Sequence, residues 1–256
     1  LYNAFELRNE LLSLGQVQFQ TASDTEVLLH ALYQWGPTVL PRLNGMFSFA
    51  FWHGPKQTLW IARDTQGIKP LWWQATPGGR AYASEIKALP NAGLPDPGQL
   101  PSLLARRHPE DSGFSDIHAV APGSLHQWTA NEGWSTSTWY VPPTPLPKSG
   151  FSADTFQSLL TDALLRQLEA QVNIGLFLSG GVDSSLLLAL MKAEGLPRVP
   201  AFAATMRKED QRYGTQDGNY AAQAAAIFGT TLDVLEVAPK ALDRFPEYMA
   251  TMDTPI

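Results

Sequence analysis

The sequence contains the run Ser179-Gly180-Gly181-Val182-Asp183-Ser184-Ser185, which lies between two segments of different periodicity. Residues 172–178 are a short, mainly apolar run that predicts a strand, and residues 184–193 have the spacing of a helix. Paired glycines allow backbone conformations that other residues avoid, so phosphate oxygens can approach the main chain. The start of a helix offers unpaired N–H groups and a positive dipole end, which favour an anion. This order of strand, glycine loop and helix predicts a phosphate-binding loop.

The loop differs from two common nucleotide-binding motifs. It lacks the lysine of the Walker motif Gly-x-x-x-x-Gly-Lys-Ser/Thr, and it lacks the Gly-x-Gly-x-x-Gly fingerprint of dinucleotide sites. Ser179, Ser184 and Ser185 add hydroxyl donors, and Asp183 supplies a carboxylate suited to Mg²⁺ beside phosphates. The alternative is a tight turn capped by Asp and Ser, but the full seven-residue run between a strand and a helix favours the nucleotide interpretation.

Strands and helices alternate through the second half of the chain. Beyond the loop we expect a strand at 199–205, a helix at 220–228, a strand at 232–237 and a helix at 241–252. Before the loop, one face of a helix is marked by Phe156, Leu159, Leu160, Ala163, Leu164 and Leu168. The alternation predicts a doubly wound parallel sheet, an α/β fold.

The first half is richer in short strands. We expect strands at 45–52, 58–64, 71–73 and 81–84, the last two separated by the turn Pro77-Gly78-Gly79. A capping signal at Ser23-Asp24-Thr25-Glu26 precedes apolar residues at helical spacing, namely Val27, Leu28, Ala31, Leu32 and Trp35. Short strands joined by tight turns predict an antiparallel sheet with a few helices, an α+β fold.

A proline-rich stretch separates the two patterns. Residues 137–150 hold four of the 20 prolines, which favours an extended linker. We therefore expect one domain at 1–136 and a second at 151–256. Because the chain does not begin with Met and ends without a helix cap or polar tail, we expect a fragment truncated at both ends.

Composition excludes several classes of protein. The formal net charge is -6 and no long run of Lys or Arg occurs, which argues against nucleic acid as a partner. No apolar stretch approaches the ~20 residues of a membrane span, and the first residues do not resemble a signal peptide, so a cytoplasmic protein without membrane association is expected. The sequence has no cysteine, so it contains no disulfide, zinc-thiolate site or cysteine nucleophile.

Several motifs in fixed order carry a resemblance to a known family. In the first half they are Leu1-Tyr2-Asn3, Ser23–Leu29, Leu43–Phe47, Ala62–Leu71 and Ala83–Leu89. The run at 179–185 resembles the signature of the ATP-pyrophosphatase (PP-loop) superfamily. Over nearly its whole length, the chain closely resembles the glutamine-hydrolysing asparagine synthetases. The resemblance implies an antiparallel αββα Ntn-hydrolase-like sandwich, a type 2 glutamine amidotransferase domain. It also implies a following PP-loop domain with a doubly wound parallel sheet, similar to the adenine nucleotide alpha hydrolases.

The resemblance also implies a ligase with two reactions. Glutamine is hydrolysed in the first domain, and the ammonia travels to the second. There ATP adenylates aspartate, and ammonia displaces AMP to give asparagine, with pyrophosphate as the other product. The implied cofactors are ATP and Mg²⁺, the implied partners are glutamine and aspartate, and a homodimer is a possible assembly.

Site residues follow from the resemblance, position by position. Asp24 matches the aspartate that binds the α-amino group of glutamine. The structural alternative is the N-cap of the helix that follows, a role that is compatible with the first. Asp183 and Ser179 are the catalytic candidates, and Asp183 is the metal ligand. Phe177 and Ala204 match positions that contact adenine, although both could equally be core residues. The ATP-binding set comprises Phe177, Ser179, Gly180, Gly181, Val182, Asp183, Ser184, Ser185 and Ala204.

The chain departs from the family pattern in three ways. The family nucleophile is a cysteine at the mature N-terminus, which we expect upstream of Leu1. The motif Ser-Gly-x-Gly-Ser/Ala-Asp-Glu, which completes the ATP and metal site, is expected beyond Ile256. Relatives often have Asp-Glu where this chain has Asp217-Gly218.

Two other functions remain as alternatives. One is an enzyme similar to β-lactam synthetases, which closes a ring by adenylating a carboxylate. The other is a nucleotide-binding paralogue without catalytic activity.

Other conspicuous residues are assigned structural roles. Arg63-Asp64 is expected to form a structural ion pair rather than a catalytic pair. Core and sheet packing, rather than a carbohydrate or base-stacking site, is expected for Trp72, Trp73, Trp134 and Trp139. All the histidines are expected on the surface or in turns, because they show no metal-ligand spacing: His30, His53, His108, His118 and His126.

Overall fold

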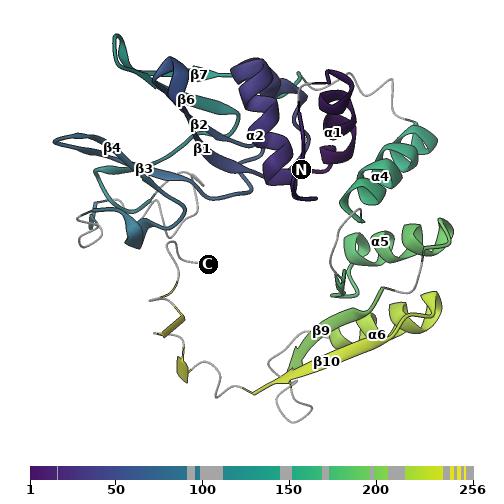
Figure 1. Ribbon diagram of the computed structural model, residues 1–256. Coiled ribbons are helices and arrows are strands. Elements are labelled where there is room, and N and C mark those ends of the chain that lie inside the picture. The colour runs from purple at the N-terminus through teal and green to yellow at the C-terminus, as the bar shows by residue number, and fades with distance from the viewer. Residues whose placement is uncertain are drawn as a thin grey trace. The chain divides into compact units, whose positions relative to one another are not determined.

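The computed structural model describes residues 1–15, 17–90, 96–98, 112–144, 152–168, 173–196, 199–206, 217–238, 243–244, 247–248 and 251. The chain divides into two compact units, one of Leu1–Pro145 with Met249–Ile256 and one of Leu146–Tyr248 (Figure 1). The expected linker at 137–150 overlaps the last strand of the first unit, and its residues 145–150 lie outside the described part of the chain.

Two helices begin the first unit. α1 (Ala4–Ser13) is followed by α2 (Asp24–Trp35), and a 3₁₀ helix, η1 (Gly36–Arg42), continues from α2. The capping signal before α2 is confirmed, because the Ser23 side chain accepts a hydrogen bond from the Thr25 N–H. Of the apolar residues expected on the inner face of α2, three are fully buried: Val27, Ala31 and Leu32.

Two antiparallel sheets follow in the first unit. The larger has the order β1-β2-β6-β7 and the smaller the order β4-β3-β5. The strands are β1 (Ser48–His53), β2 (Thr58–Arg63), β3 (Trp72–Thr76), β4 (Gly79–Ala83), β5 (Ile117–Ala119), β6 (Ser124–Thr129) and β7 (Gly133–Thr138). Short 3₁₀ helices follow β1 and β4, at η2 (Gly54–Lys56) and η3 (Ile86–Ala88). The antiparallel arrangement and β1 to β4 agree with the sequence prediction, whereas β5, β6 and β7 were not anticipated.

Alternation along β2 assigns the two faces of the larger sheet. Trp60 and Ala62 belong to the main core with residues of α1 and α2, which cover one face of the sheet (Figure 1). Ile61 points the other way, into a cluster with Trp73 and Tyr82 of the smaller sheet. The sheets therefore pack face to face through the side chains that the helices do not cover.

The prediction of surface histidines is wrong for two of them. His53 is 6% exposed and His126 is 5% exposed. The Nδ1 atom of His53 accepts a hydrogen bond from the Lys56 N–H at 3.1 Å, and the ring lies 5.0 Å from that of Tyr33. Each histidine lies at an inward-facing strand position, and histidine spacing along the sequence carries no information about that.

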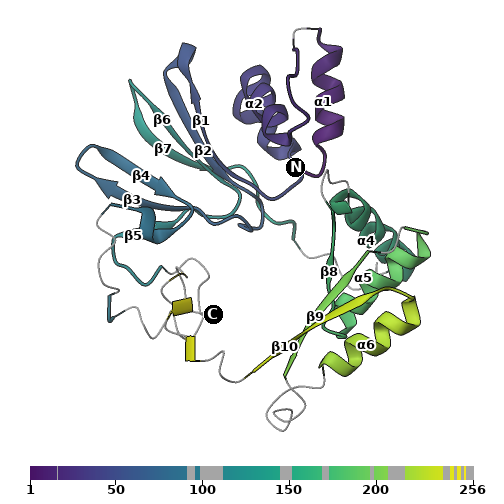
Figure 2. The ribbon, with the colours of Figure 1, turned by 60° about the horizontal axis from the view of Figure 1, so that its bottom comes forward.

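The second unit contains a parallel sheet with helices on one face. Its strands have the order β10-β9-β8, and Figure 2 shows α5 and α6 beside one face, with α4 next to α5. The elements are α4 (Ala153–Leu168), β8 (Leu176–Phe177), α5 (Val182–Ala193), β9 (Ala201–Met206), α6 (Asp217–Phe228) and β10 (Leu232–Val237). The parallel pairing agrees with the prediction. Among the described helices of the whole chain, none is both long and apolar enough to cross a bilayer.

Some details of the second unit differ from the prediction. The strand expected at 172–178 is limited to β8, and the helix expected from residue 184 begins two residues earlier. Phe156 is 50% exposed and Leu159 is 66% exposed, although both lie on the apolar face predicted for this helix. Leu164 alone of that face is fully buried, in a cluster with residues of α5. The helix expected at 241–252 falls mostly outside the described residues.

Candidate functional site

Gly180 of the glycine loop lies in close contact with α6. Gly180 has a φ of +78°, a left-handed conformation that side chains disfavour. A Cβ atom at this position would lie 2.4 Å from both the backbone nitrogen of Ala221 and the carbonyl carbon of Tyr220. Glycine is therefore required here both by the backbone conformation and by the packing of α6 against the loop.

Serine hydroxyls bracket the start of α5. The Oγ atoms of Ser179 and Ser184 lie 3.1 Å apart. The Gly181 N–H donates to Ser179 Oγ at 3.3 Å, and Ser184 Oγ donates to the Gly181 carbonyl at 3.3 Å. Gly181 is the N-cap residue, so no side chain caps the helix. The first-turn N–H groups of α5 and the two hydroxyls therefore form a compact group of hydrogen-bond donors.

Asp183 is the acidic residue of this loop. It lies in the first turn of α5 and is exposed, and the neighbouring Val182 is 82% exposed. Within the described ranges, no group of three or more acidic or histidine side chains is placed to hold a metal ion. A metal at Asp183 would therefore take most of its ligands from water or from a bound phosphate chain.

Phe177 and Ala204 lie on the same face of the parallel sheet. Phe177 is in register with Phe202 of β9, and Ala204 is two residues further along β9, so the side chains project to one side. Phe177 is 88% exposed and Ala204 is also exposed, whereas Ala201 and Ala203 are buried toward the helices. The alternative that Phe177 and Ala204 are core residues is therefore wrong. Both lie on the face opposite α5 and α6.

The first turn of α6 approaches the end of β9. A Cβ atom at Gly218 would lie 2.7 Å from the Oγ1 atom of Thr205. A side chain at position 218 would therefore meet the Thr205 side chain, which would have to shift to make room for it.

Asp24 is the first residue of α2, and its side chain is half exposed. The alternative that Asp24 is the N-cap is wrong, because Ser23 occupies that position and makes the capping hydrogen bond. Ser23 therefore caps α2, and the Asp24 carboxylate is half exposed at the start of the helix.

Polar side chains bring together the separate motif segments of the first unit. The Asn3 side chain donates to the Arg42 carbonyl at 2.9 Å and accepts from the Asn44 N–H at 3.0 Å. Asp64 is fully buried and accepts hydrogen bonds from the backbone N–H groups of Phe47, Gln66, Ile68 and Lys69. Through these bonds, side chains of two motif segments organise the main chain of the segments around them.

Arg63 has a similar structural role. Its guanidinium donates to the carbonyl oxygens of Lys69, Val120 and Gly67 at 2.9, 2.7 and 2.7 Å. Arg63 and Asp64 therefore both have structural roles, whereas the predicted ion pair between them stays a prediction. Each residue fixes the surrounding main chain through hydrogen bonds from its side chain to backbone groups.

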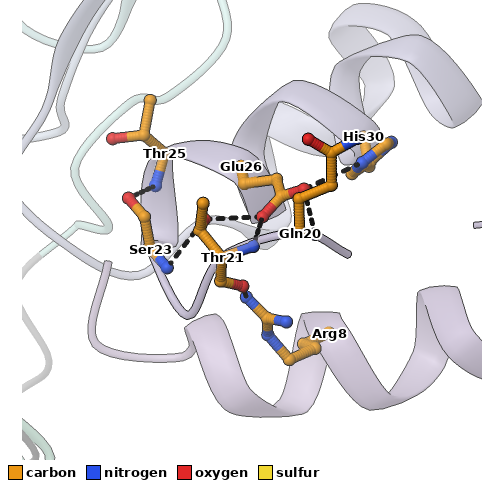
Figure 3. Close-up of polar contacts among 7 residues, drawn as sticks. All are labelled: Arg8, Gln20, Thr21, Ser23, Thr25, Glu26 and His30. Atoms are coloured by element: carbon orange, nitrogen blue, oxygen red, sulfur yellow. Dashed lines mark hydrogen bonds and ion pairs between the residues drawn. The ribbon is translucent and has the colours of Figure 1, made fainter. Parts of the chain in front are cut away.

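Glu26 is a residue whose role the sequence did not predict. Its carboxylate accepts hydrogen bonds from the N–H of Gln20 at 2.8 Å and from the N–H and hydroxyl of Thr21 at 2.7 and 2.6 Å (Figure 3). These bonds, with a smaller contribution from His30, lower the Glu26 pKa from 4.5 to about 2. The sequence signal for Glu26 was the Ser-x-x-Glu capping pattern. That pattern predicts a hydrogen bond from the Ser23 N–H to Glu26, whereas the observed donors are Gln20 and Thr21.

Comparison with known proteins places both units in described families. Residues 1–140 match the family model of the glutamine amidotransferase domain, and residues 155–256 match that of asparagine synthase. Asparagine synthetase [glutamine-hydrolyzing] 3 of Bacillus subtilis is 30% identical over all of this chain and 44% of its own length. Asparagine synthetase [glutamine-hydrolyzing] of Zea mays is 31% identical over 74% of this chain and 28% of its own length.

A solved structure is similar to the chain at lower identity. Glutamine phosphoribosylpyrophosphate amidotransferase from B. subtilis, complexed with ADP and GMP, is 17% identical, with a TM-score of 0.41 over 91% of this chain and 43% of that one. The chain spans less than half the length of the synthetases that it matches. The chain belongs to the glutamine amidotransferase domain family over residues 1–140 and, with its asparagine synthase region, to the family of glutamine-hydrolysing asparagine synthetases.

Proposed function

We propose that this chain takes part in making asparagine from aspartate, with glutamine as the nitrogen donor and ATP as the energy source. The observation that carries the proposal is the loop at 179–185, whose donors gather at the start of α5 beside the ends of parallel strands. In open α/β sheets, ligands bind at the carboxyl ends of the strands. Residues 1–140 match a glutamine amidotransferase domain, and such a domain would supply the nitrogen from within the same polypeptide.

The detailed folds are part of the proposal. The two face-to-face sheets and the helices on the larger sheet support an αββα Ntn-hydrolase-like sandwich for domain 1–136. The parallel sheet with its glycine loop supports a PP-loop domain at 151–256, after a linker at 137–150. The doubly wound arrangement stays a prediction, because the described helices lie on one face of the sheet, whereas that fold has helices on both faces. The cytoplasmic location and the homodimer expected from the sequence remain predictions.

The donors of the loop suit the leaving group of the ATP reaction. An oxygen of the aspartate side-chain carboxylate attacks the α-phosphorus of ATP, and the bond to the β-phosphate oxygen breaks to release pyrophosphate. Negative charge develops on pyrophosphate as this bond breaks. The N–H groups of α5 and the hydroxyls of Ser179 and Ser184 would stabilise that charge from fixed positions. Ammonia then attacks the aspartyl carbonyl, and AMP leaves as asparagine forms.

Phe177 and Ala204 would place the adenine ring. Both residues are exposed on the sheet face away from α5 and α6. Phe177 lies two residues before Ser179, where the loop begins. A flat apolar surface next to a phosphate-binding loop suits a purine base.

Mg²⁺ is the cation that this chemistry uses, and Asp183 would hold it. A single exposed carboxylate beside a phosphate site fits the way that Mg²⁺ is bound, through one or two carboxylates, water and phosphate oxygens. When bound, the ion would neutralise charge on the phosphates.

Asp24 would bind the substrate of the first domain. Its half-exposed carboxylate is a natural partner for the α-ammonium group of glutamine, since charged hydrogen bonds of this kind are strong. The relatives named above favour this reaction over a ring-closing, β-lactam-synthetase-like activity and over a paralogue without catalysis.

A comparison of two aspartates tests the proposal in the full-length polypeptide that carries this sequence. Asp183→Ala should abolish ATP-dependent pyrophosphate release and leave glutamate formation from glutamine intact. The control is Asp154→Ala, because Asp154 is the acidic residue in the first turn of another helix, α4. Formation of asparagine from aspartate, measured by chromatography, identifies the product. Equal loss of both activities in Asp183→Ala, or a product other than asparagine, would contradict the proposal.

A further inference from the structure

The residues on either side of Asp24 are held by hydrogen bonds that lead back to Glu26. The Ser23 N–H donates to Thr21 Oγ1 at 3.2 Å, and the Thr25 N–H donates to Ser23 Oγ at 3.1 Å (Figure 3). Thr21 Oγ1 in turn donates to a Glu26 carboxylate oxygen. The turn that leads into α2, and with it the backbone of Asp24, is thus tied to one carboxylate.

A second helix holds the same turn from the other side. Arg8 of α1 donates from its guanidinium to the Thr21 carbonyl at 2.7 Å. The same guanidinium lies 4.0 Å from the centre of the Phe19 ring, and Phe19 meets the His30 ring edge-on at 5.1 Å. The turn is therefore clamped between α1 and α2. The N–H groups of Gln20 and Thr21 donate hydrogen bonds to Glu26 of α2, and the Thr21 carbonyl accepts one from Arg8 of α1.

We propose that Glu26 is a positioning residue for glutamine binding, because its carboxylate fixes the turn that directs Asp24 toward the α-ammonium group of the substrate. This inference rests on the proposed function and names a residue that acts through Asp24. Glu26 is not expected to touch the substrate.

The chemistry of the contacts explains why a carboxylate is needed. One oxygen of Glu26 accepts from Gln20, and the other accepts from both the N–H and the hydroxyl of Thr21. A glutamine side chain would replace one of these oxygens by an NH₂ group, which would face N–H donors and accept nothing. Glu26→Gln therefore removes part of the clamp while it keeps the size of the side chain.

Steady-state kinetics of the full-length polypeptide test the inference. With glutamine as donor, Glu26→Gln should raise KM about tenfold, the loss expected when a charged hydrogen bond is broken, with kcat close to wild type. With ammonium chloride as donor, asparagine formation should be unchanged, because that reaction does not use Asp24. Glu26→Asp keeps the charge and should recover part of the effect. Glu10→Gln is the matched control, because Glu10 makes an exposed ion pair with Arg42 on the neighbouring helix.

A double-mutant cycle separates positioning from general stability. If Glu26 acts through Asp24, then Glu26→Gln should change KM for glutamine less than about twofold when Asp24→Asn is already present. Full additivity would mean that Glu26 acts independently of Asp24 and would overturn the inference, as would a wild-type KM in Glu26→Gln.

Thr21→Val provides a milder variant of the same clamp. It removes the hydroxyl that joins Glu26 to Ser23, and it should raise KM for glutamine about threefold. If Glu26→Gln fails to fold, Thr21→Val decides by the same criteria. Absence of glutamine hydrolysis in the wild type would contradict the proposed function itself, whereas normal hydrolysis with unchanged KM in both variants would contradict only this inference.

Discussion

Gly180 shows how one residue can be constrained by both its own backbone and a neighbouring helix. Its φ of +78° and the 2.4 Å approach to α6 act at the same position. Gly195, which follows α5, has a similar φ of +65°, but a Cβ atom added there would meet no atom within 4 Å. The two glycines therefore separate conformational strain from steric overlap.

Gly180→Ala should lower ATP-dependent pyrophosphate release by about a hundredfold, because displacement of a site by even ~1 Å has an effect of this size. Gly195→Ala should reduce stability by about 1 kcal/mol through its left-handed backbone alone and should leave pyrophosphate release unchanged. Pyrophosphate release and thermal unfolding, measured for both variants, check the prediction. Equal effects of the two substitutions on pyrophosphate release would show that contact with α6 is unimportant.

Phe177 and Leu178 are adjacent in sequence but differ in environment. Phe177 is 88% exposed, whereas Leu178 is 1% exposed and lies in the core of the second unit. Phe177→Ser should change the free energy of unfolding by no more than about 0.5 kcal/mol, and Leu178→Ala should reduce it by about 2–4 kcal/mol. Urea denaturation of the two variants measures both values. A large loss of stability in Phe177→Ser would contradict the exposed position of Phe177 and indicate that its side chain packs in the core.

At the scale of elements, the contact between the two sheets of the first unit contains a buried histidine. His126 of β6 faces the smaller sheet, where its Nδ1 atom lies 2.8 Å from the Tyr82 hydroxyl. Burial lowers the His126 pKa from 6.5 to about 4, and the nearby Arg80 acts in the same direction. Burial also raises the Tyr82 pKa, so both partners favour their neutral forms.

This contact predicts how stability depends on pH. Below pH 6.5 the unfolded chain protonates His126 while the folded chain does not, so the free energy of unfolding should fall as the pH decreases from 6.5 to 4. Allowing for screening by solvent, we expect a loss of about 1–2 kcal/mol. Urea denaturation at several pH values measures it, with His126→Gln as a variant that does not titrate. The same slope in both proteins over this range would contradict the assignment. Glu26 contributes separately, because its stabilising charge is lost only as the pH falls from 4.5 to about 2.

Elements differed in how well their sequences predicted them. α2 and the strands β1 to β4 carry clear periodicity or turn signals, so their existence was predicted and only their ends moved by a few residues. β6 and β7 were missed, because Ser124–Thr129 and Gly133–Thr138 contain many polar residues. Their strand conformation is stabilised by pairing with β2 and with each other, which is a tertiary effect that local sequence does not encode.

At the scale of the whole molecule, the two expected reactions belong to separate units. Asp24 lies in the unit that begins at Leu1, and Asp183 lies in the unit Leu146–Tyr248. Each unit has its own apolar core, so a change in one site need not disturb the fold of the other unit.

Asp24→Asn should therefore raise KM for glutamine about a hundredfold, because a charged partner of the substrate is lost. Asparagine formation from added ammonium chloride should continue at the wild-type rate. Kinetics with each nitrogen donor in the full-length polypeptide check this, with Asp154→Asn as the control. Loss of the ammonia-dependent reaction in Asp24→Asn would mean that the sites are not separable.

The glycine loop, the order of strands and helices around it and the family motifs were predictable from the sequence, because they depend on residue types at fixed local spacing. What surrounds those residues depends on the tertiary structure. It placed Phe177 and Ala204 on an exposed sheet face, buried His53 and His126 at inward-facing strand positions, and gave Ser23 rather than Asp24 the capping role. The steric part of the requirement for Gly180 arises from α6, a helix about forty residues away in the sequence. Burial and close approach depend on contacts between distant segments, and local spacing does not specify them.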